Sequence, residues 1–385
     1  MQFRDLRKQY ETLKPEIEAG INQVLLATNF ISGIQVSELE EQLAEYVGVK
    51  HCITCANGTD ALSLALMAWG IGRGDAVFVP DFTFFSSGEV VSFAGATPIF
   101  VDVDEDTFNL NPVSLEEAIQ KVLAEGILMP KAVVAVDLFG LPADYERIRP
   151  IVETYGLKLL EDGAQGFGGE IQGKKACSFG DISTTSFFPA KPLGCYGDGG
   201  ALFTDDDSIA DTLYSLRVHG KGTDKYDNIQ IGMNSRLDTI QAAVLKVKLK
   251  AFKDYELRDV NQTARRYTEM LDTLVKTPKI PQGFLSSWAQ YSILLKDKEE
   301  RNRLQSFLKE KRIPSMIYYK KPMHVQKAFD GVDCKKGELK VTERICDRVL
   351  ALPIHPYITE QEQGQVVDAI KEFMEERNKI MKYRN

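Results

Sequence analysis

The stretch that decides the fold runs from Leu157 to Thr204 and reads LKLLEDGAQGFGGEIQGKKACSFGDISTTSFFPAKPLGCYGDGGALFT. It begins with an apolar run that ends in the acidic residue Asp162, and it carries Lys191 between aromatic residues and prolines, ahead of a glycine-rich turn. An acidic residue that emerges from a buried strand is costly unless it meets a cationic partner. Considered alone, Asp162 is more often a cap for the following turn, and Lys191 is one of 47 basic residues. Together they are candidates for one site.

Short apolar runs rich in Val, Ile and Phe recur on both sides of this stretch, between longer segments with helical spacing. This alternation is typical of an α/β fold, in which helices cover a mostly parallel sheet. The predicted strands are residues 51–55, 76–80, 98–103, 131–137, 157–162 and 200–204. The predicted helices are residues 38–47, 60–69, 115–124 and 145–156, with Ser37, Thr59, Ser114 and Asp144 as their N-terminal caps. In such a sheet, ligands bind beyond the carboxyl ends of the strands.

The pattern changes after about Asn234, where a long amphipathic segment begins that is nearly free of glycine and proline. We expect one or two long helices there, which lead to a strand near residues 289–295, a charged helix at 296–311 and a C-terminal helix. The expected organisation is a large domain of residues 1–250 and a smaller α/β domain of residues 251–385.

Composition is that of an ordinary globular protein, and charge excludes some functions. The 385 residues include 47 Lys and Arg and 55 Asp and Glu, which give a formal net charge of −8. The chain has no basic cluster of the kind that neutralises nucleic-acid phosphates, so we expect no nucleic acid as a partner. No stretch reaches the roughly 18 apolar residues that cross a bilayer. The charged N-terminus also lacks the apolar core of a signal peptide, so we expect a cytoplasmic protein without a membrane partner.

The six cysteines are scattered, which is typical of reduced thiols rather than of a disulfide framework. Cys52 and Cys55 form a C-x-x-C pair, but no second pair follows and the four histidines lie far apart. Buried structural thiols are therefore the preferred interpretation, and we expect no metal site.

The turn Ala56–Asp60 (ANGTD) joins a predicted strand to a predicted helix and is a candidate phosphate site. The open N–H groups and the dipole at a helix start can hold an anion, and the Thr59 hydroxyl lies in the same turn. Glycine and threonine also occur in such turns simply as caps, so the turn alone decides little. It is not a G-x-x-x-x-G-K-[ST] phosphate loop, and no G-x-G-x-x-G dinucleotide fingerprint follows a predicted strand.

A phosphate turn, an acid at a strand end and a lysine beyond it are the parts that a pyridoxal phosphate enzyme needs. Here the chain resembles a known family, the sugar aminotransferases of the DegT/DnrJ/EryC1/StrS family. The resemblance implies a fold-type-I aminotransferase architecture, with a three-layer α/β/α large domain around a mostly parallel sheet and a smaller α/β C-terminal domain. The matching stretches span nearly the whole chain in the family's order: FRDLRKQY, ISGIQVSELEEQLAEYVGVKHCITCANGTDAL, PDFTFFSSGEVV, GATPIFVDVDEDTFNLNP, LLEDGAQGFGGEIQGKKACSFGDISTTSFFPAKPLGCYGDGGALFT, NSRLDTIQAAVL, YYKKPMHVQKAF and LPIHPY.

The resemblance also implies roles for individual residues. Lys191 matches the lysine that binds pyridoxal 5′-phosphate (PLP) covalently as an internal aldimine and then moves a proton from the donor Cα. Asp162 matches the residue that keeps the pyridine nitrogen protonated. The other matched cofactor-binding residues are Gly58, Thr59 and Ser186 for the phosphate, Gln165 for the ring hydroxyl, Phe84 for the pyridine face, and Asn234, which reaches the phosphate in the neighbouring subunit. An obligate homodimer with its two sites at the interface is therefore expected.

The implied reaction is the transfer of an amino group from L-glutamate to a nucleotide-linked keto sugar. The stretches SFFPAKPLGCYGDGGA and NSRLDTIQAA are most similar to the branch that acts on 3-keto sugars and forms UDP-2-acetamido-3-amino-2,3-dideoxy-glucuronate for O-antigen, a lipopolysaccharide component. Arg236 is the candidate partner for the C6 carboxylate of the sugar, with an interface ion pair as the alternative. Tyr318 and Tyr319 match a substrate-facing pair that is His then Tyr in that branch. This difference leaves a dTDP-3-keto-6-deoxyhexose, and after it a 4-keto sugar, as alternatives.

Gly163 stands where relatives commonly have alanine, and we expect this glycine to loosen a packing contact near the ring. Lys191 argues against the dehydratases of the family, in which histidine replaces the lysine. Two other classes fit less well. A non-catalytic regulator of this fold should lose Lys191 or Asp162 and gain a basic DNA-binding segment, and a nicotinamide-dependent sugar dehydrogenase should carry the fingerprint glycines.

Overall fold

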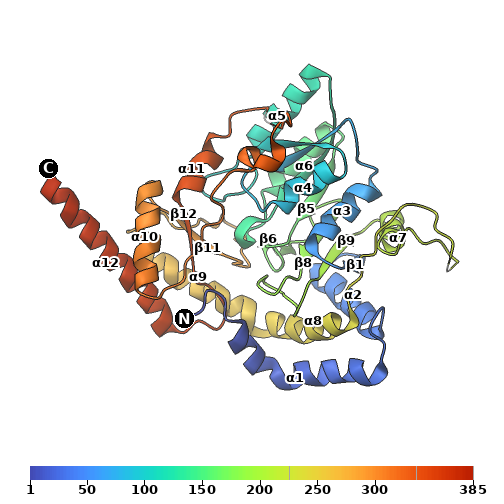
Figure 1. The fold of residues 1–385 in the computed structure, drawn as a ribbon, viewed down its shortest axis with the longest axis horizontal. Helices are drawn as coiled ribbons and strands as arrows, with labels where there is room; N and C mark the ends of the chain where they lie inside the picture. Colours follow the sequence, from blue (N-terminus) through green and yellow to red (C-terminus); the bar gives the residue numbers. More distant parts are fainter. Residues whose placement is uncertain (225, 335, 385) are drawn as a thin grey trace.

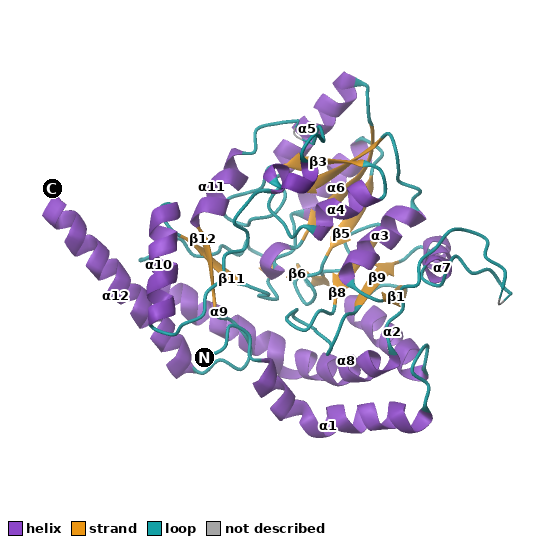
Figure 2. Cartoon of the chain, viewed as in Figure 1, coloured by secondary structure: helices purple, strands orange, loops and turns teal. Residues whose placement is uncertain are grey.

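The computed structural model describes residues 1–224, 226–334 and 336–384 and shows a large sheet between helices, next to a smaller C-terminal part (Figures 1 and 2). The helices are α1 Leu6–Ala27, α2 Ile34–Val47, α3 Gly58–Ala68, α4 Ser86–Phe93, α5 Pro112–Glu125, α6 Tyr145–Thr154, α7 Asp207–Leu216, α8 Thr239–Ala251, α9 Leu257–Leu271, α10 Lys298–Glu310, α11 Lys340–Arg348 and α12 Glu360–Arg384. The strands are β1 His51–Cys55, β2 Asp75–Pro80, β3 Thr97–Val101, β4 Met129–Val136, β5 Lys158–Asp162, β6 Glu170–Ile171, β7 Lys174–Lys175, β8 Ile182–Ser186, β9 Gly200–Thr204, β10 Phe284–Leu285, β11 Tyr291–Leu294 and β12 Val349–Leu352.

The large sheet has the strand order β1-β9-β8-β5-β4-β2-β3. The strands from β8 to β3 pair in parallel, whereas β9 is antiparallel to both β8 and β1. All six predicted strands are present in this sheet, which confirms a mostly parallel α/β arrangement.

The seventh strand, β8, is absent from the prediction because its sequence ISTTS has no apolar pattern. Ser183, Thr184 and Thr185 are nevertheless buried, and neighbouring groups satisfy their hydroxyls. The Ser183 hydroxyl donates to Glu161 Oε2 at 2.7 Å, and the Thr185 hydroxyl donates to the carbonyl of Gly163 at 3.0 Å. A buried strand can therefore be polar where hydrogen-bond partners replace apolar contacts.

Alternate residues of the central strands point to opposite faces of the sheet, and both faces are covered by helices. On one face, Val77 and Val79 of β2 belong to a core that includes residues of α3, α4 and α7. On the other face, Phe78 packs with α5 and α6, and Cys52 of β1 packs with α2 and α8. These contacts confirm the three-layer α/β/α architecture.

The C-terminal part has its own core, in which α9, α10 and α12 pack on the antiparallel pair of β11 and β12. Helices α8 and α9 are joined without a loop, through a π-helical turn at Phe252–Glu256. We propose that the boundary between a domain of residues 1–250 and a domain of residues 251–385 lies at this turn, because α8 before it packs with α2 and the large sheet, whereas α9 after it belongs to the C-terminal core.

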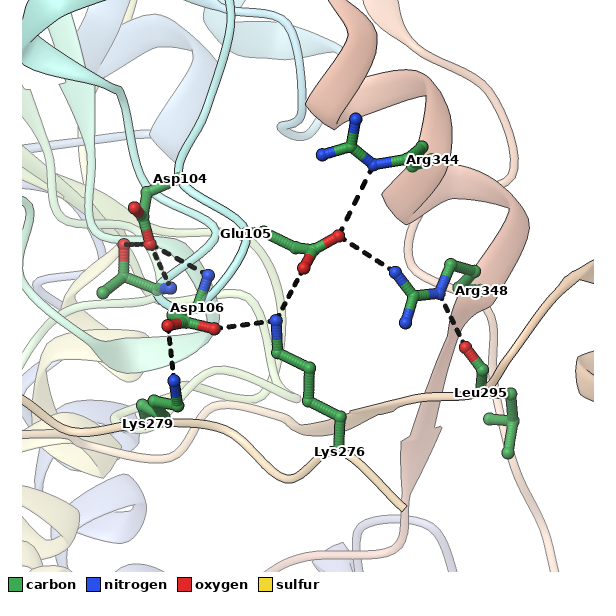
Figure 3. A network of polar contacts seen from close by, with 9 residues as sticks. Asp104, Glu105, Asp106, Lys276, Lys279, Leu295, Arg344 and Arg348 are labelled. Carbon is green, nitrogen blue, oxygen red and sulfur yellow. Dashed lines mark hydrogen bonds and ion pairs between the residues drawn. The ribbon is translucent and has the colours of Figure 1, made fainter.

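A network of charged side chains joins the C-terminal part to the loop that follows β3 (Figure 3). The Lys276 ammonium lies 2.7 Å from the carboxylates of both Glu105 and Asp106. Arg348 Nη1 lies 2.9 Å from Glu105, and Lys279 Nζ lies 2.6 Å from Asp106. Hydrogen bonds from Lys276 lower the pKa of both carboxyl groups. Because the loop follows the carboxyl end of β3, this network holds the C-terminal part beside the edge where a ligand is expected.

In the described part of the chain, no helix is both long and apolar enough to span a membrane. All six cysteines are buried. Residues 1–224, 226–334 and 336–384 contain no group of three His, Cys, Asp or Glu side chains arranged to hold a metal ion.

Candidate active site

Asp162 is the last residue of β5 and lies at the carboxyl end of the sheet, where it is 5% exposed. Its Oδ2 accepts a hydrogen bond from the Ser87 hydroxyl at 2.7 Å, and its Oδ1 accepts one from the Ala164 amide at 3.2 Å. Burial raises the pKa of Asp162, while the two hydrogen bonds and the charge of Lys191 act in the opposite direction. The site therefore presents a buried carboxyl group held in one orientation.

Lys191 lies in a closed turn between β8 and β9. Its amide donates a hydrogen bond to the carbonyl of Phe188 at 2.8 Å. A Cβ at Gly194 would lie 2.6 Å from the carbonyl oxygens of both Phe188 and Pro189, so this close approach requires glycine. The glycine and proline residues around the lysine thus shape the turn that presents it.

Lys191 and Asp162 lie close enough for each charge to affect the pKa of the other group. Burial lowers the pKa of the Lys191 amine to about 8, the nearby Asp162 charge raises it, and the charge of Arg4 lowers it further. An amine with this pKa is half neutral near pH 8, whereas an ordinary lysine is almost fully protonated there. Lys191 can therefore act as a nucleophile and as a base under mild conditions.

The three residues predicted to hold a phosphate form one cradle. Gly58 and Thr59 open α3, and Asn57 caps this helix by accepting a hydrogen bond from the Asp60 amide at 2.8 Å. The first amides of a helix have no acceptor within the helix, so those of Gly58 and Thr59 can bind an anion. Ser186 at the end of β8 lies alongside, since a Cβ at Gly58 would be 2.7 Å from Ser186 Cβ. Only glycine at position 58 leaves this cradle open.

Gln165 connects the turn after β5 to the tyrosine pair of the C-terminal part. Its Oε1 accepts a hydrogen bond from the Phe139 amide at 2.7 Å, and its Nε2 donates one to the Tyr319 hydroxyl at 3.2 Å. Burial raises the pKa of Tyr319, so this hydroxyl stays protonated. The Phe84 ring is 54% exposed, and its centroid lies 6.4 Å from that of the Tyr319 ring. The centroids of the Tyr318 and Tyr319 rings lie 5.8 Å apart. Tyr319 therefore contacts the other three predicted residues, Gln165, Phe84 and Tyr318.

Asn234 and Arg236 lie in a cavity of about 480 Å³ whose wall also includes Ala56, in the turn that leads into α3. Ser235 anchors this segment, because its hydroxyl donates to Asp60 at 2.7 Å and accepts from the Ala56 amide at 3.0 Å. The buried Nε of Arg236 has no hydrogen-bond partner among the described residues. Both side chains thus lie beside the turn that leads into α3, but Gly58, Thr59 and Ser186 do not line this cavity. In the described chain, neither side chain forms a hydrogen bond with Lys191 or the tyrosine pair.

Gly163 does not loosen the packing near the site, and the expectation from sequence is wrong. An added Cβ would lie 2.6 Å from Cys177 Sγ and 3.0 Å from the carbonyl oxygen of Thr184. The Gly163 amide also donates to that carbonyl at 2.9 Å. The space that an alanine methyl group needs is filled by the Cys177 sulfur, so glycine is the residue that fits here.

Sequence reasoning missed several polar residues around the predicted ones. Ser87 orients Asp162, and Ser86 accepts a hydrogen bond from the Thr59 hydroxyl at 3.2 Å. Two adjacent serines at a helix start beyond a strand end were the signal that could have found them. Arg4, in the matched stretch FRDLRKQY, also lies near the site without having been assigned a role.

These residues fit PLP. The buried Asp162 carboxylate suits a protonated ring nitrogen, the Lys191 amine of lowered pKa suits covalent attachment to an aldehyde, and the cradle at Gly58 suits a phosphate. Gln165 and Phe84 both contact Tyr319, which places an amide and an aromatic ring next to one another. The fold and the site together define an aminotransferase of the PLP-dependent, fold-type-I class.

Comparison with known proteins identifies the family. The sequence profile of the DegT/DnrJ/EryC1/StrS aminotransferase family matches residues 11–371, and the chain belongs to this family. The chain is 41% identical to UDP-2-acetamido-2-deoxy-3-oxo-D-glucuronate aminotransferase of Pseudomonas aeruginosa, over 93% of this chain and 96% of that protein. It is 40% identical to a pleiotropic regulatory protein of Geobacillus stearothermophilus, over 96% and 97% of the two chains. It is 36% identical to dTDP-3-amino-3,6-dideoxy-alpha-D-galactopyranose transaminase of Aneurinibacillus thermoaerophilus, over 96% and 99%.

Solved structures agree with this assignment. The crystal structure of a DegT DnrJ EryC1 StrS aminotransferase from Brucella abortus is 50% identical, with a TM-score of 0.95 over 97% of this chain and 99% of that one. The structure of ntda from Bacillus subtilis with bound cofactor PMP is 28% identical, with a TM-score of 0.86 over 94% and 82%. The protein is a sugar aminotransferase, and PLP is the cofactor of its family.

Proposed function

We propose that the protein transfers an amino group from L-glutamate to C3 of a UDP-linked 2-acetamido-3-keto-glucuronate, for the biosynthesis of a surface polysaccharide such as O-antigen. The observation that carries the proposal is the buried Asp162 at the carboxyl end of the sheet, with Lys191 close enough to interact with its charge and the phosphate cradle beside it. The similarity to the Pseudomonas aeruginosa aminotransferase supports the UDP-linked acceptor.

PLP, when bound, supplies an electron sink for the charge that develops on the donor Cα as it loses a proton. Asp162 would hold a proton on the ring nitrogen, with its Oδ2 kept in place by the Ser87 hydroxyl at 2.7 Å. Lys191 would attach the cofactor, and after release its neutral Nζ would accept the Cα proton. The lowered pKa of Lys191 supports this second role, because a protonated amine cannot act as a base.

The remaining predicted residues would bind and orient the cofactor. Gly58, Thr59 and Ser186 would bind its phosphate, Gln165 its ring hydroxyl, and Phe84 would stack on its ring. Gln165 is well suited because its amide is already oriented by the Phe139 amide and the Tyr319 hydroxyl.

We also propose a homodimer in which Asn234 reaches the phosphate bound by the second copy. The exposure of Asn234 supports this role, because an exposed side chain is available to another subunit.

Arg236 would pair with the C6 carboxylate of the sugar, and Tyr318 and Tyr319 would donate hydrogen bonds to the sugar nucleotide. The unpartnered Nε of Arg236 supports this assignment, because a buried guanidinium nitrogen without an acceptor suits an anionic ligand. A dTDP-3-keto-6-deoxyhexose is the second candidate acceptor, and Tyr318 at the position of a histidine favours it, as does the similarity to a dTDP-sugar transaminase. A purely regulatory role is disfavoured because both Lys191 and Asp162 are present.

The test is a mass-spectrometric screen in which the purified enzyme receives glutamate and a panel of UDP- and dTDP-linked 3-keto and 4-keto sugars. We expect the amino product from the UDP-linked 3-keto-uronate and 2-oxoglutarate in equal amount. Faster conversion of the dTDP-deoxyhexose would overturn the choice of sugar. Conversion of no keto sugar would overturn the transaminase function.

Lys191→Ala is the matched variant for this screen. We expect it to lose turnover but to remain folded and to bind the cofactor, because the phosphate and ring contacts do not depend on Lys191. A glutamate half-reaction at the wild-type rate in this variant would refute the role of Lys191.

A further inference from the structure

The N-terminal segment Phe3–Gln9 lies against the turn that carries Lys191. Nη2 of Arg4 donates a hydrogen bond to the Lys191 carbonyl at 2.7 Å and approaches the Pro192 carbonyl at 3.4 Å. The Lys191 amide already donates to Phe188 within the turn. Both backbone groups of Lys191 are therefore held, one by the turn itself and one by a residue far away in the sequence.

Arg4 is itself held firmly. Asp5, the next residue, caps α1 by accepting a hydrogen bond from the Lys8 amide at 2.9 Å. One turn into the helix, Gln9 donates to Glu256 Oε1 at 2.8 Å, and Glu256 is only 2% exposed. The start of α1 thus presents the guanidinium to the Lys191 turn from a fixed backbone.

The same segment contacts Tyr318, one of the two tyrosines proposed to bind the sugar nucleotide. The Phe3 ring lies 6.2 Å from the Tyr318 ring in an edge arrangement. Lys8 donates to the carbonyl of Tyr357 at 3.1 Å, and the Tyr357 hydroxyl donates to Glu256 at 2.5 Å. The N-terminal segment therefore connects the Lys191 turn with the C-terminal part of the chain.

We propose that Arg4 is a positioning residue for Lys191, because its guanidinium fixes the carbonyls of Lys191 and Pro192 and so sets where the Lys191 amine lies relative to Asp162. This inference rests on the proposed role of Lys191 in the transamination. A displacement of about 1 Å at a reacting group can cost on the order of 100-fold in rate, so a contact that fixes the lysine backbone affects the chemistry.

The charges around Arg4 support the same role. Burial lowers the pKa of Arg4 to about 10, and the charge of Glu256 counteracts this, so the guanidinium remains positive at neutral pH. Lys191 faces two charged groups, Asp162, which raises its pKa, and Arg4, which lowers it. Burial is the main cause that lowers the pKa of Lys248 and of His355, and the positive charge of Arg4 lowers both further, while the charge of Glu256 raises that of Lys248. The loss of Arg4 should therefore change the pKa of the Lys191 amine as well as its position.

The alternative is that Arg4 only anchors the N-terminus. Three variants separate the two roles. Arg4→Gln removes the charge and the two-pronged guanidinium, and Arg4→Lys keeps the charge but loses the guanidinium. Arg7→Gln is a control at an exposed arginine in the first turn of α1, the helix that follows Arg4. The first measurement is the pKa of the Lys191 amine in the cofactor-free protein. Competitive labelling with acetic anhydride between about pH 6 and pH 11, followed by mass spectrometry of the Lys191 peptide, reports this value for the single residue.

We expect the labelling midpoint of Lys191 to lie near the wild-type value in Arg7→Gln and Arg4→Lys and to be higher in Arg4→Gln. In the loaded enzyme, we expect the rate of the glutamate half-reaction to fall roughly 10-fold or more in Arg4→Gln and less in Arg4→Lys, because the charge alone restores only part of the positioning. An unchanged midpoint and an unchanged half-reaction rate in Arg4→Gln would overturn the inference, even if thermal stability fell. If Arg4→Gln does not fold, Arg4→Lys provides the test, because this variant lacks the guanidinium. A wild-type half-reaction rate in Arg4→Lys would then overturn the inference.

Failure of the proposed function gives a different pattern. If Lys191→Ala carries out the glutamate half-reaction at the wild-type rate, the role of Lys191 is wrong. If Lys191→Ala is inactive and Arg4→Gln matches the wild type in midpoint and rate, only the inference about Arg4 is wrong.

Discussion

Replacement of Gly163 with alanine should destabilise the protein. The added methyl group would lie 2.6 Å from Cys177 Sγ and 3.0 Å from the Thr184 carbonyl oxygen. The turn cannot move away freely, because Gly163 donates to Thr184 at 2.9 Å and accepts from the Thr185 hydroxyl at 3.0 Å. Overpacking of this kind costs about 1–3 kcal/mol of unfolding free energy.

Cys177→Ala removes the atom that the new methyl group would meet. On its own, this change deletes one fully buried sulfur and should cost on the order of 1 kcal/mol. In the double variant, the methyl group of Ala at position 163 would occupy the space of the sulfur. We expect the combined loss to be smaller than the sum of the single losses by about 1–2 kcal/mol, the coupling typical of residues in contact.

The assay is urea unfolding of the cofactor-free protein, so that ligand binding does not contribute to the measured stability. Gly364→Ala in α12 is the matched control, because an added Cβ there meets nothing within 4 Å, and we expect a gain of up to about 1 kcal/mol. The reasoning is refuted if Gly163→Ala changes the stability by less than about 0.5 kcal/mol or if the two substitutions are additive.

Three further predictions concern charge. Lys276→Met should cost up to about 1 kcal/mol at neutral pH and low salt, since it breaks the partly exposed pairs with Glu105 and Asp106. Because folding lowers the pKa of both carboxyl groups, the stability that the pairs contribute is present above their unfolded pKa near 4 and is lost in stronger acid. If the variant and the wild type differ in unfolding free energy as much at pH 2 as at neutral pH, the prediction is wrong. Burial lowers the pKa of His355 to about 4, so the unfolded state binds a proton at a higher pH than the folded state does. The free energy of unfolding should therefore fall as the pH is lowered from about 6.5 to 4, and His355→Gln should reduce this fall. The same fall in the variant and the wild type would disprove the prediction. Arg236→Ala should weaken the use of uronate acceptors and leave the glutamate half-reaction largely intact, whereas equal loss of both would indicate a structural role.

Some local features follow from the sequence alone because they depend on neighbouring residues only. The apolar runs predict six of the seven strands of the large sheet, since each run must be buried wherever it lies. Among the predicted helix caps, Asp144 is confirmed, with its side chain accepting from the Arg147 amide. The helices predicted to begin at Ser37, Thr59 and Ser114 begin earlier, after Gly33, Asn57 and Asn111. Several consecutive polar residues can cap a helix, and only the path of the backbone selects one of them.

Part of the chemistry of the site could also be predicted from the sequence, because Asp162 and Lys191 stand in sequence contexts that are unfavourable for a charged side chain without an oppositely charged partner. Whether Gly163 loosens or fills the packing could not be predicted, since this depends on Cys177, which the fold places against the turn. The same holds for the polar strand β8, whose hydroxyls donate to groups on β5 and in the turn that follows it.

The sequence by itself determined the α/β class, the strand runs and the residue types that a PLP site requires. Only the tertiary structure decided which distant groups complete that site. Three hydrogen bonds do so: from Ser87 to Asp162, from Gln165 to Tyr319 and from Arg4 to the Lys191 carbonyl. The physical reason is that hydrogen bonds and charge effects act over a few ångströms in space, whereas composition and periodicity report only on residues that are close along the chain.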